Sequence, residues 1–149
     1  MIYNKDNCVN ILLVEDSPGD VELTREALSH GNIIHQLDVA CDGEEALFFL
    51  NKQGKYCKAQ TPDLILLDLN MPRKDGLEVL KEIRTHQKLK SIPVIILTTS
   101  NSELDIFKCY DNYANAYFVK PVDLNEFFDT VAAIEDFWFN IATLPIIAN

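Results

Sequence analysis

Three acids, a threonine and a lysine stand at the ends of short apolar runs, where their side chains could do chemistry together. Glu15 and Asp16 follow VNILLV, Asp68 follows LILL, Thr98 follows VIIL and Lys120 follows AYFV. Carboxylates brought to one place repel each other, so at least one would keep its proton unless a cation lay between them. Because all the candidate ligands are oxygens and no Cys or His stands near them, this donor set favours Mg²⁺ over zinc.

The same residue types suit a phosphoryl group. Mg²⁺ usually takes one or two carboxylates and keeps its other positions for waters and phosphate oxygens. The Lys120 ammonium can place a compact charge on those oxygens, and the Thr98 hydroxyl can donate a hydrogen bond to them. Phosphoryl transfer needs mainly in-line positioning and charge neutralisation, and a carboxylate can be the accepting nucleophile. Asp68 is the candidate acceptor, because it ends the most apolar run and is held most rigidly.

Five strand–helix units are predicted to position these side chains. The predicted strands are Val9–Val14, Ile34–Ala40, Leu64–Leu67, Val94–Leu97 and Ala116–Val119. The predicted helices are Pro18–Ser29, Gly43–Lys52, Leu77–His86, Glu103–Tyr113 and an extended last helix from Leu124 to about Ile141. Runs that are apolar at every position, such as LILL, are typical of a parallel sheet with helices on both faces. The predicted fold is a doubly wound α/β sandwich whose five-stranded parallel sheet has the flavodoxin-like order 2-1-3-4-5.

Such a sheet binds ligands outside the carboxyl ends of its strands, at the point where the strand order reverses. The residues that directly follow each predicted strand therefore share one rim. Taken singly, Asp16 could be a helix cap, Asp68 a turn residue and Lys120 a solvated charge. Their common position on one rim favours the chemical interpretation over these separate structural ones.

Composition limits the classes of function. A chain of 149 residues builds one domain, and its net charge of -10 repels phosphate backbones and anionic lipid, which argues against nucleic-acid and membrane partners. The four cysteines show no CxxC pairing, as expected of reduced thiols in a cytoplasm. The first seven residues, MIYNKDN, lack the basic flank and apolar core of an export signal. We therefore expect a cytoplasmic protein.

Four motifs resemble the receiver domain of bacterial two-component response regulators. They are LLVEDSPGD at Leu12–Asp20, LILLDLNMPRKDGLEVL at Leu64–Leu80, PVIILTTS at Pro93–Ser100 and AYFVKP at Ala116–Pro121. The resemblance covers about residues 9–134 of a single receiver domain spanning 1–149, with 135–149 as a helix extension and tail. The segment IEDFWFNIATLP at Ile134–Pro145 is similar to single-domain regulators that partner cyanobacterial phytochromes, which are red-light-sensing histidine kinases.

The resemblance implies a signalling protein rather than an enzyme with a substrate of its own. Asp68 would take a phosphoryl group from a kinase phosphohistidine, and Lys120 would contact the phosphoryl oxygens. Mg²⁺ would be held by Asp16, Asp68 and the main-chain carbonyl of Asn70, with Glu15 acting through a water. At most, such a protein phosphorylates and dephosphorylates itself.

The resemblance also implies how the signal leaves the site. Thr98 would move toward the phosphate and Tyr117 would swing inward, remodelling the surface formed by the fourth helix, fifth strand and fifth helix. The Lys120–Pro121 peptide bond is expected to be cis. Since the chain ends shortly after the last helix, we expect no DNA-binding output domain, and the downstream partner is a protein that the sequence does not identify.

Aromatic residues on the last two helices indicate an interface. The stripe predicted to pack on the sheet is Phe127, Val131, Ile134, Trp138 and Ile141. Phe128 flanks this stripe, and Phe107 and Tyr110 add aromatic surface on the helix before it. Exposed aromatic patches commonly mark interfaces, so we expect a symmetric homodimer through the last two helices and the strand between them.

Two other classes of protein remain open. A phosphatase of the haloacid dehalogenase type also forms an aspartyl phosphate, but it needs a second acid two residues after the nucleophile, where this chain has Asn70. It also carries its nucleophile after the first strand, whereas Asp68 follows the third. A receiver fold kept only as a binding module would not need the complete set of acids, threonine and lysine.

Overall fold

Five parallel strands form one sheet in the order β2-β1-β3-β4-β5, which confirms the predicted fold class. The computed structural model describes residues 8–147, so the segment examined for an export signal, residues 1–7, lies outside it. The strands are β1 (Val9–Val14), β2 (His35–Ala40), β3 (Leu64–Leu67), β4 (Val94–Thr98) and β5 (Ala116–Val119). Every residue of β3 and β4 is buried, as their continuous apolar character predicts for strands covered on both faces.

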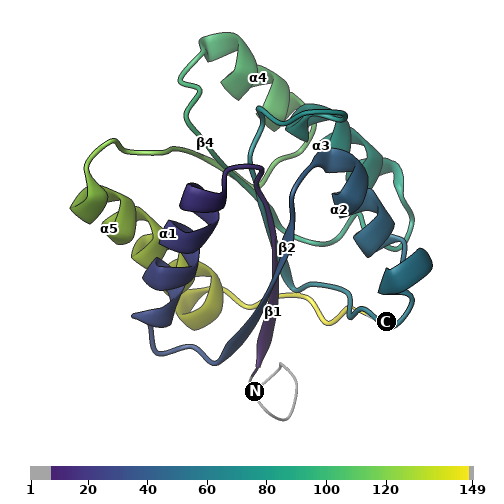
Figure 1. The fold of residues 1–149 in the computed structure, drawn as a ribbon, viewed down its shortest axis with the longest axis horizontal. Helices are drawn as coiled ribbons and strands as arrows, with labels where there is room; N and C mark the ends of the chain where they lie inside the picture. The colour runs from purple at the N-terminus through teal and green to yellow at the C-terminus, as the bar shows by residue number, and fades with distance from the viewer. Residues whose placement is uncertain (1–7, 148–149) are drawn as a thin grey trace.

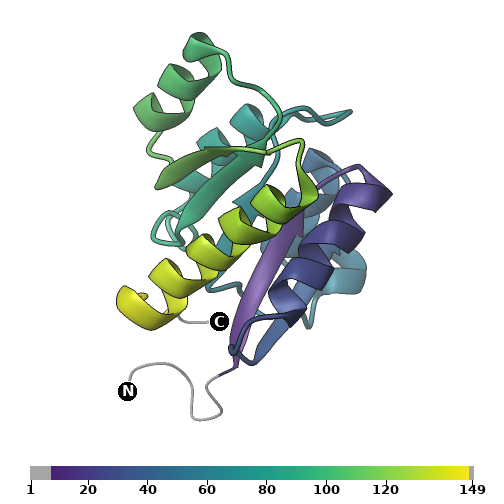
Figure 2. The same ribbon diagram turned by 90° about the vertical axis from the view of Figure 1, so that its left-hand side faces the viewer.

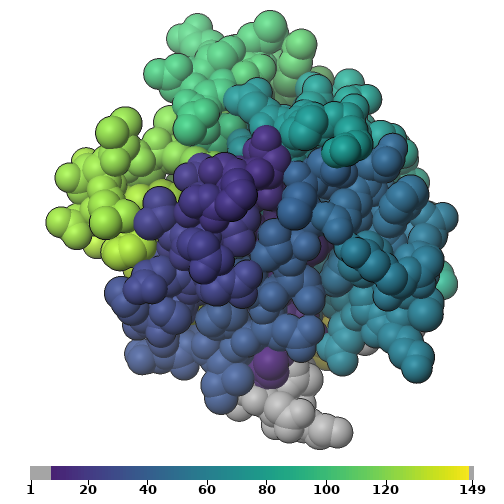
Figure 3. All heavy atoms as spheres, viewed as in Figure 1, coloured from purple at the N-terminus to yellow at the C-terminus, as the bar shows by residue number. Residues whose placement is uncertain are grey.

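Helices cover both faces of the sheet (Figure 1). One face carries α1 (Pro18–Ser29) and α5 (Leu124–Glu135), which contact each other. The other face carries α2 (Gly43–Leu50), α3 (Gly76–Thr85) and α4 (Glu103–Asp111). In the space-filling view, α1 and α2 occupy the middle of the visible face, with α4 and α5 at its margin (Figure 3). Alternate strand residues point into two separate hydrophobic cores, one under each helical layer.

Strand register brings the ends of the central strands to one rim. Val14 of β1 pairs with Leu67 of β3, so the residues that follow them are neighbours. Thr98 at the end of β4 pairs with Val119 of β5, directly before Lys120. The fold therefore delivers the chemically interesting side chains to a common edge of the sheet.

Capping residues start each helix close to that rim. The N-cap residues are Ser17, Asp42, Asp75, Ser102 and Asp123, and each side chain accepts a hydrogen bond from a backbone N–H in the first turn. Such caps satisfy the otherwise unpaired donors of a helix start. Asp75 also forms a capping box with Glu78. Local sequence thus sets where each strand–helix connection turns back over the sheet.

The last helix changes its character at residue 136. The sequence predicts one helix to about Ile141, but α5 ends at Glu135 and a π-helical segment, η2 (Asp136–Ile141), continues the chain. The wider π turn shifts the helical stripe, so that Ile141, predicted to pack on the sheet, is 67% exposed. Trp138 still packs against the core beneath α5. Figure 2 shows α5 and η2 lying along one side of the molecule.

The chain end crosses beneath the sheet. After η2, the chain runs from the α5 side toward the side that carries α2 and α3 (Figure 1). Leu144 is buried, and Ile147 packs against the core under α2 and α3. The long connection before β3 holds a short 3₁₀ helix, η1 (Gly54–Tyr56), whose tyrosine packs against the same core. The tail therefore tethers the two helical layers at the amino end of the sheet.

The Lys120–Pro121 bond, expected to be cis, is trans, which corrects that expectation; the trans form is the intrinsically preferred one even before proline. Among residues 8–147, no helix has the length and apolar character needed to cross a bilayer.

Candidate functional site

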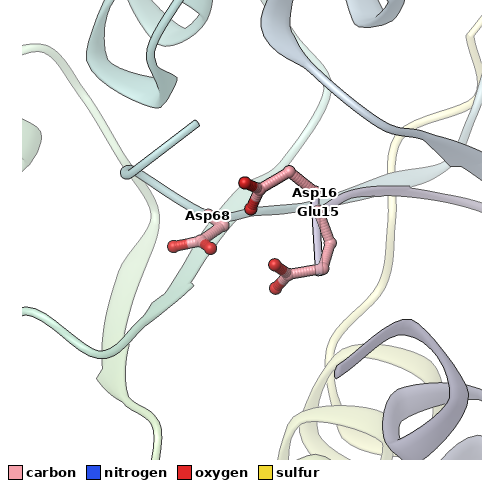
Figure 4. Close-up of side chains that lie close together, drawn as sticks. All are labelled: Glu15, Asp16 and Asp68. Atoms are coloured by element: carbon pink, nitrogen blue, oxygen red, sulfur yellow. The ribbon is translucent and has the colours of Figure 1, made fainter. Parts of the chain in front are cut away.

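Three carboxylates meet at the carboxyl end of the sheet. Glu15 and Asp16 come from the end of β1 and Asp68 from the end of β3, and one oxygen of each lies within 4.8 Å of the others. Figure 4 shows the three carboxyl groups turned toward a common space. Hard divalent cations prefer such oxygen donors, so the residues present fit a Mg²⁺-type ion.

Asp68 is held in a fixed orientation. Its side chain is almost fully buried, its backbone N–H donates to the Val14 carbonyl, and its Oδ1 accepts the Leu69 backbone N–H at 2.7 Å. The other oxygen, Oδ2, lies 3.6 Å from the Lys120 ammonium. The carboxylate is therefore presented with one oxygen anchored and the other facing a positive charge.

Lys120 joins the ends of three elements. Its Nζ donates to Glu15 Oε1 at 2.5 Å and to Asp20 Oδ2 at 2.7 Å, in addition to its contact with Asp68. Burial lowers the pKa of Lys120, but the hydrogen bonds to Asp20 and Glu15 outweigh burial, so its pKa lies above the ordinary value. The ammonium is thus a permanent positive charge within the acidic cluster.

Glu15 is the most deeply buried acid of the cluster. Burial raises the pKa of Glu15 to about 7, against the opposing effect of its hydrogen bond to Lys120. Its second oxygen accepts the Ser17 backbone N–H at 3.1 Å. Repulsion from Asp68 acts in the same direction as burial, which is the crowding of carboxylates that the sequence predicts.

Thr98 and Tyr117 lie on neighbouring strands beside this cluster. Thr98 is fully buried, and its hydroxyl has no hydrogen-bond partner among the described residues. The Tyr117 hydroxyl donates to the Ser100 carbonyl at 2.8 Å, and the Ser100 hydroxyl donates to Asp105 on α4. A buried hydroxyl without a partner costs stability, so Thr98 marks a place for an acceptor that these residues do not supply.

Asn70 lies two residues past Asp68, exposed in the connection to α3. It lines a cavity of about 170 Å³ together with Asp75 of the same connection and Lys108 of α4. Gly76 closes this connection through its backbone N–H, which donates to the Leu69 carbonyl. The Asn70 carbonyl, the predicted ligand, is therefore on a loop that a backbone hydrogen bond holds against the end of β3.

The residues predicted to form a dimer interface differ in exposure. On α4, Phe107 is 65% and Tyr110 49% exposed. Phe128 on α5 is half-buried, packs against the core, and its ring meets the His30 ring edge-on at 5.6 Å between centroids. The exposed aromatic surface thus lies mainly on α4, and Phe128 contributes less of it than the sequence suggests.

Sequence reasoning missed two residues that organise the site and its support. Asp20 shares Lys120 with Glu15, although its position alone indicates only an acid in the first turn of a helix. Arg84 on α3 donates to the carbonyls of Tyr113, Lys90 and Ile92 and to the Asn115 side chain. Nothing in the local sequence of either residue indicates its distant partners.

Comparison with known proteins gives consistent matches. Residues 11–132 match the model of the response regulator receiver domain. Response regulator Rcp1 of Synechocystis sp. is 47% identical over 135 residues, which cover 91% of this chain and 92% of Rcp1. The solved structure of the phosphorylated cyanobacterial phytochrome response regulator RcpA is 47% identical and aligns with a TM-score of 0.90 over 93% of this chain and 99% of that one. The Mn²⁺-bound form of Rcp1, 46% identical, aligns with a TM-score of 0.89 over the same shares.

Proposed function

The chain belongs to the response regulator receiver family, and from this premise we propose that Asp68 accepts a phosphoryl group from a phosphohistidine of a sensor histidine kinase. One observation carries the proposal: the buried Asp68 carboxylate lies beside two other carboxylates, and its Oδ2 is 3.6 Å from the Lys120 ammonium. The unpartnered Thr98 hydroxyl on the neighbouring strand supports it, because phosphoryl oxygens are the acceptors it lacks.

The transfer follows from this arrangement. A carboxylate oxygen of Asp68 attacks phosphorus, and the new P–O bond forms as the P–N bond to the histidine breaks. The electron pair of the P–N bond stays on the imidazole nitrogen, which takes a proton from solvent. The Leu69 N–H holds the carboxylate in place. Lys120 neutralises charge on the phosphoryl oxygens, and Thr98 donates a hydrogen bond to one of them. This transfer needs no acid at the position of Asn70, whereas a phosphatase of the haloacid dehalogenase type needs one there.

The acidic residues fit Mg²⁺, held by Asp16, Asp68 and the Asn70 main-chain carbonyl, with Glu15 acting through a water. Bound there, the cation would supply positive charge for the phosphoryl oxygens. The Mn²⁺-bound form of Rcp1 supports a divalent ion in this family. Mg²⁺ is proposed because oxygen ligands and room for phosphate oxygens are what this ion requires.

The test is labelling with a small acyl phosphate in the presence of Mg²⁺. We expect a phosphoryl adduct that hydroxylamine cleaves, that Asp68→Asn abolishes and that Asp129→Asn, on the exposed surface of α5, retains. An adduct that persists in Asp68→Asn would contradict the assignment. Catalytic turnover of added phosphate esters would favour a phosphatase, and no adduct in the wild type would favour a pure binding module.

The proposed kinase is of the phytochrome type, in the cytoplasm. The similarity to Rcp1 and to the phytochrome response regulator RcpA supports this partner. Phosphotransfer from a phosphorylated phytochrome kinase to Asp68, faster than from an unrelated histidine kinase, would test it. The net charge of -10 supports protein rather than nucleic-acid or membrane partners for the output.

The proposed output surface is formed by α4, β5 and α5. Movement of Thr98 toward the phosphoryl group and of Tyr117 inward would release the hydrogen bond from Tyr117 to Ser100, which is itself bonded to α4. The same surface carries the exposed rings of Phe107 and Tyr110. We place the contact of a symmetric homodimer here, with Phe128 at its margin.

Sedimentation velocity at tens of micromolar tests the dimer. The wild type is expected to sediment as a dimer, and Phe107→Ser to shift toward monomer. Phe48→Ser is the matched control, because Phe48 is an exposed aromatic residue on α2, away from the proposed surface. A wild-type protein that sediments as a monomer, or equal effects of the two substitutions, would contradict the proposed contact.

A further inference from the structure

Asp20 holds the ammonium of Lys120 from outside the acidic trio. Its Oδ2 accepts from Lys120 Nζ at 2.7 Å, across 100 positions of sequence. Asp20 is not one of the carboxylates whose oxygens lie within 4.8 Å of one another, a group made of Glu15, Asp16 and Asp68. Asp20 therefore bonds the lysine without belonging to the proposed cation site.

Glu15 has two competing roles, and Asp20 has one. Glu15 bonds Lys120 and is also a member of the trio that fits a divalent cation. A divalent cation held by the trio would attract the Glu15 carboxylate, and this attraction would weaken the bond from Glu15 to the lysine. Asp20, which lies outside the trio, would keep its bond to Lys120 in that case.

The backbone of α1 fixes Asp20 in place. The backbone N–H of Asp20 donates to the hydroxyl of the N-cap Ser17 at 3.3 Å. The backbone carbonyl of Asp20 accepts a hydrogen bond from the hydroxyl of the buried Thr24 at 2.8 Å. The side chain of Asp20 is 35% exposed, whereas that of Lys120 is 6% exposed. Asp20 thus lies on the solvent side of the lysine and limits its movement away from the site.

We propose that Asp20 is a positioning residue for Lys120, holding its ammonium beside Asp68 during phosphoryl transfer. This inference rests on the proposed function. In the structure the ammonium is 3.6 Å from Asp68 Oδ2, outside direct hydrogen-bond distance but close enough to meet an incoming phosphoryl oxygen. Fixing the charge before the reaction avoids reorganisation as the transition state forms.

A simpler role for Asp20 predicts a different result. An acid in the first turn of a helix stabilises the helix through its dipole, whatever its side chain contacts. Glu126 occupies the first turn of α5, and among residues 8–147 the acids paired with Lys120 are Glu15, Asp20 and Asp68. Glu126→Gln therefore removes the same kind of charge without touching the site. Asp20→Glu keeps the charge and can still reach the lysine.

The experiment compares Asp20→Asn, Asp20→Glu and Glu126→Gln. With saturating acetyl phosphate and Mg²⁺, we expect Asp20→Asn to lower the maximal rate of Asp68 labelling roughly fivefold, with an unchanged half-saturating concentration of the donor. Asp20→Glu should recover most of the rate, and Glu126→Gln should match the wild type. Hydrogen exchange of the Lys120 ammonium, followed by NMR, should speed up only in Asp20→Asn.

The outcomes distinguish a failure of the role of Asp20 from a failure of the proposed phosphoryl transfer to Asp68. Normal labelling of the wild type together with an unimpaired rate in Asp20→Asn would overturn the role of Asp20 alone. Equal losses in Asp20→Asn and Glu126→Gln would also overturn it, because they would indicate a dipole effect. A wild-type protein without any adduct on Asp68 would refute the proposed function, and this inference with it.

Discussion

The carbonyl oxygen of Asp68 lies against Gly76, only 2.1 Å from the place where any other residue at position 76 would have its β-carbon. The backbone N–H of Gly76 also donates to the Leu69 carbonyl at 2.9 Å. These contacts fold the connection from β3 to α3 tightly against the end of the strand. A glycine is therefore needed for close approach, and its neighbour in space is the proposed acceptor.

Gly76→Ala is expected to disturb both stability and chemistry. The new methyl group would meet backbone atoms of Asp68 and Leu69, which cannot rotate away, so the free energy of unfolding should fall by about 2 kcal/mol. Displacement of Asp68 should also slow its labelling by acetyl phosphate. Gly19→Ala is the control, because a β-carbon there meets only the Ser17 hydroxyl at 3.9 Å. Urea unfolding and labelling rates measure both effects, and equal behaviour of the two variants would contradict the argument.

Thr98→Val should separate stability from signalling. The Thr98 hydroxyl is buried and unpartnered among residues 8–147, so replacing it with a methyl group should raise the free energy of unfolding by about 1 kcal/mol. The output surface that Thr98 is proposed to remodel also carries the proposed dimer contact, so we expect phosphorylation to change the dimer affinity of the wild type but not that of Thr98→Val. Thr24→Val is the matched control, since the buried Thr24 hydroxyl donates to the Asp20 carbonyl and its loss should destabilise the protein. A destabilised Thr98→Val would show that its hydroxyl already has a partner.

Mg²⁺ should stabilise the folded protein through the acidic trio. If Mg²⁺ binds the native state and not the unfolded state, it raises the free energy of unfolding by about 1.4 kcal/mol at a concentration tenfold above its dissociation constant. The melting temperature rises accordingly. Asp16→Asn should remove most of this rise, because Asp16 is one of the three clustered carboxylates. Asp129→Asn should retain it. Thermal melts with and without Mg²⁺ at matched ionic strength provide the measurement, and an undiminished rise in Asp16→Asn would contradict the assigned ligand.

Glu135 predicts a pH dependence far from the proposed site. It is buried at the end of α5, where a β-carbon on Gly31 would collide with its carboxyl group, and its Oε2 has no hydrogen-bond partner among residues 8–147. Burial raises the pKa of Glu135 above 4.5, with His35 acting in the opposite direction. Because the pKa of Glu135 is higher in the folded than in the unfolded state, its protonated carboxyl stabilises the folded protein below pH 4.5. This contribution to the free energy of unfolding is lost as the pH rises through the pKa of the folded state.

Glu135→Gln should therefore gain stability relative to the wild type as the pH rises from about 4.5 toward neutrality. The glutamine stays neutral, whereas the wild-type carboxyl must ionise in a buried position. Denaturant unfolding at a series of pH values measures the difference. Glu126→Gln, an exposed acid on the same helix, provides the comparison and should show no such trend. A difference between wild type and Glu135→Gln that is constant with pH would contradict the explanation.

The sequence alone determined the local features of this protein. Apolar runs such as LILL and VIIL predict buried parallel strands, and Ser17, Asp42 and Asp123 begin helices, because these signals act within a few residues. The chain order of strands and helices then places Asp68 and its companions on one rim of the sheet. The motif resemblance adds a family that the comparisons confirm.

The tertiary structure decided which side chains meet. Lys120 bonds Glu15 and Asp20, which lie about a hundred positions earlier, and Arg84 bonds carbonyls on two separate connections. The sequence pattern also did not predict the change to a π-helical turn after Glu135. Apolar periodicity indicates which face of a helix is buried but not the pitch of its last turns. The choice of partner depends on how closely groups far apart in the chain approach one another in space, and spacing along a sequence carries no such information.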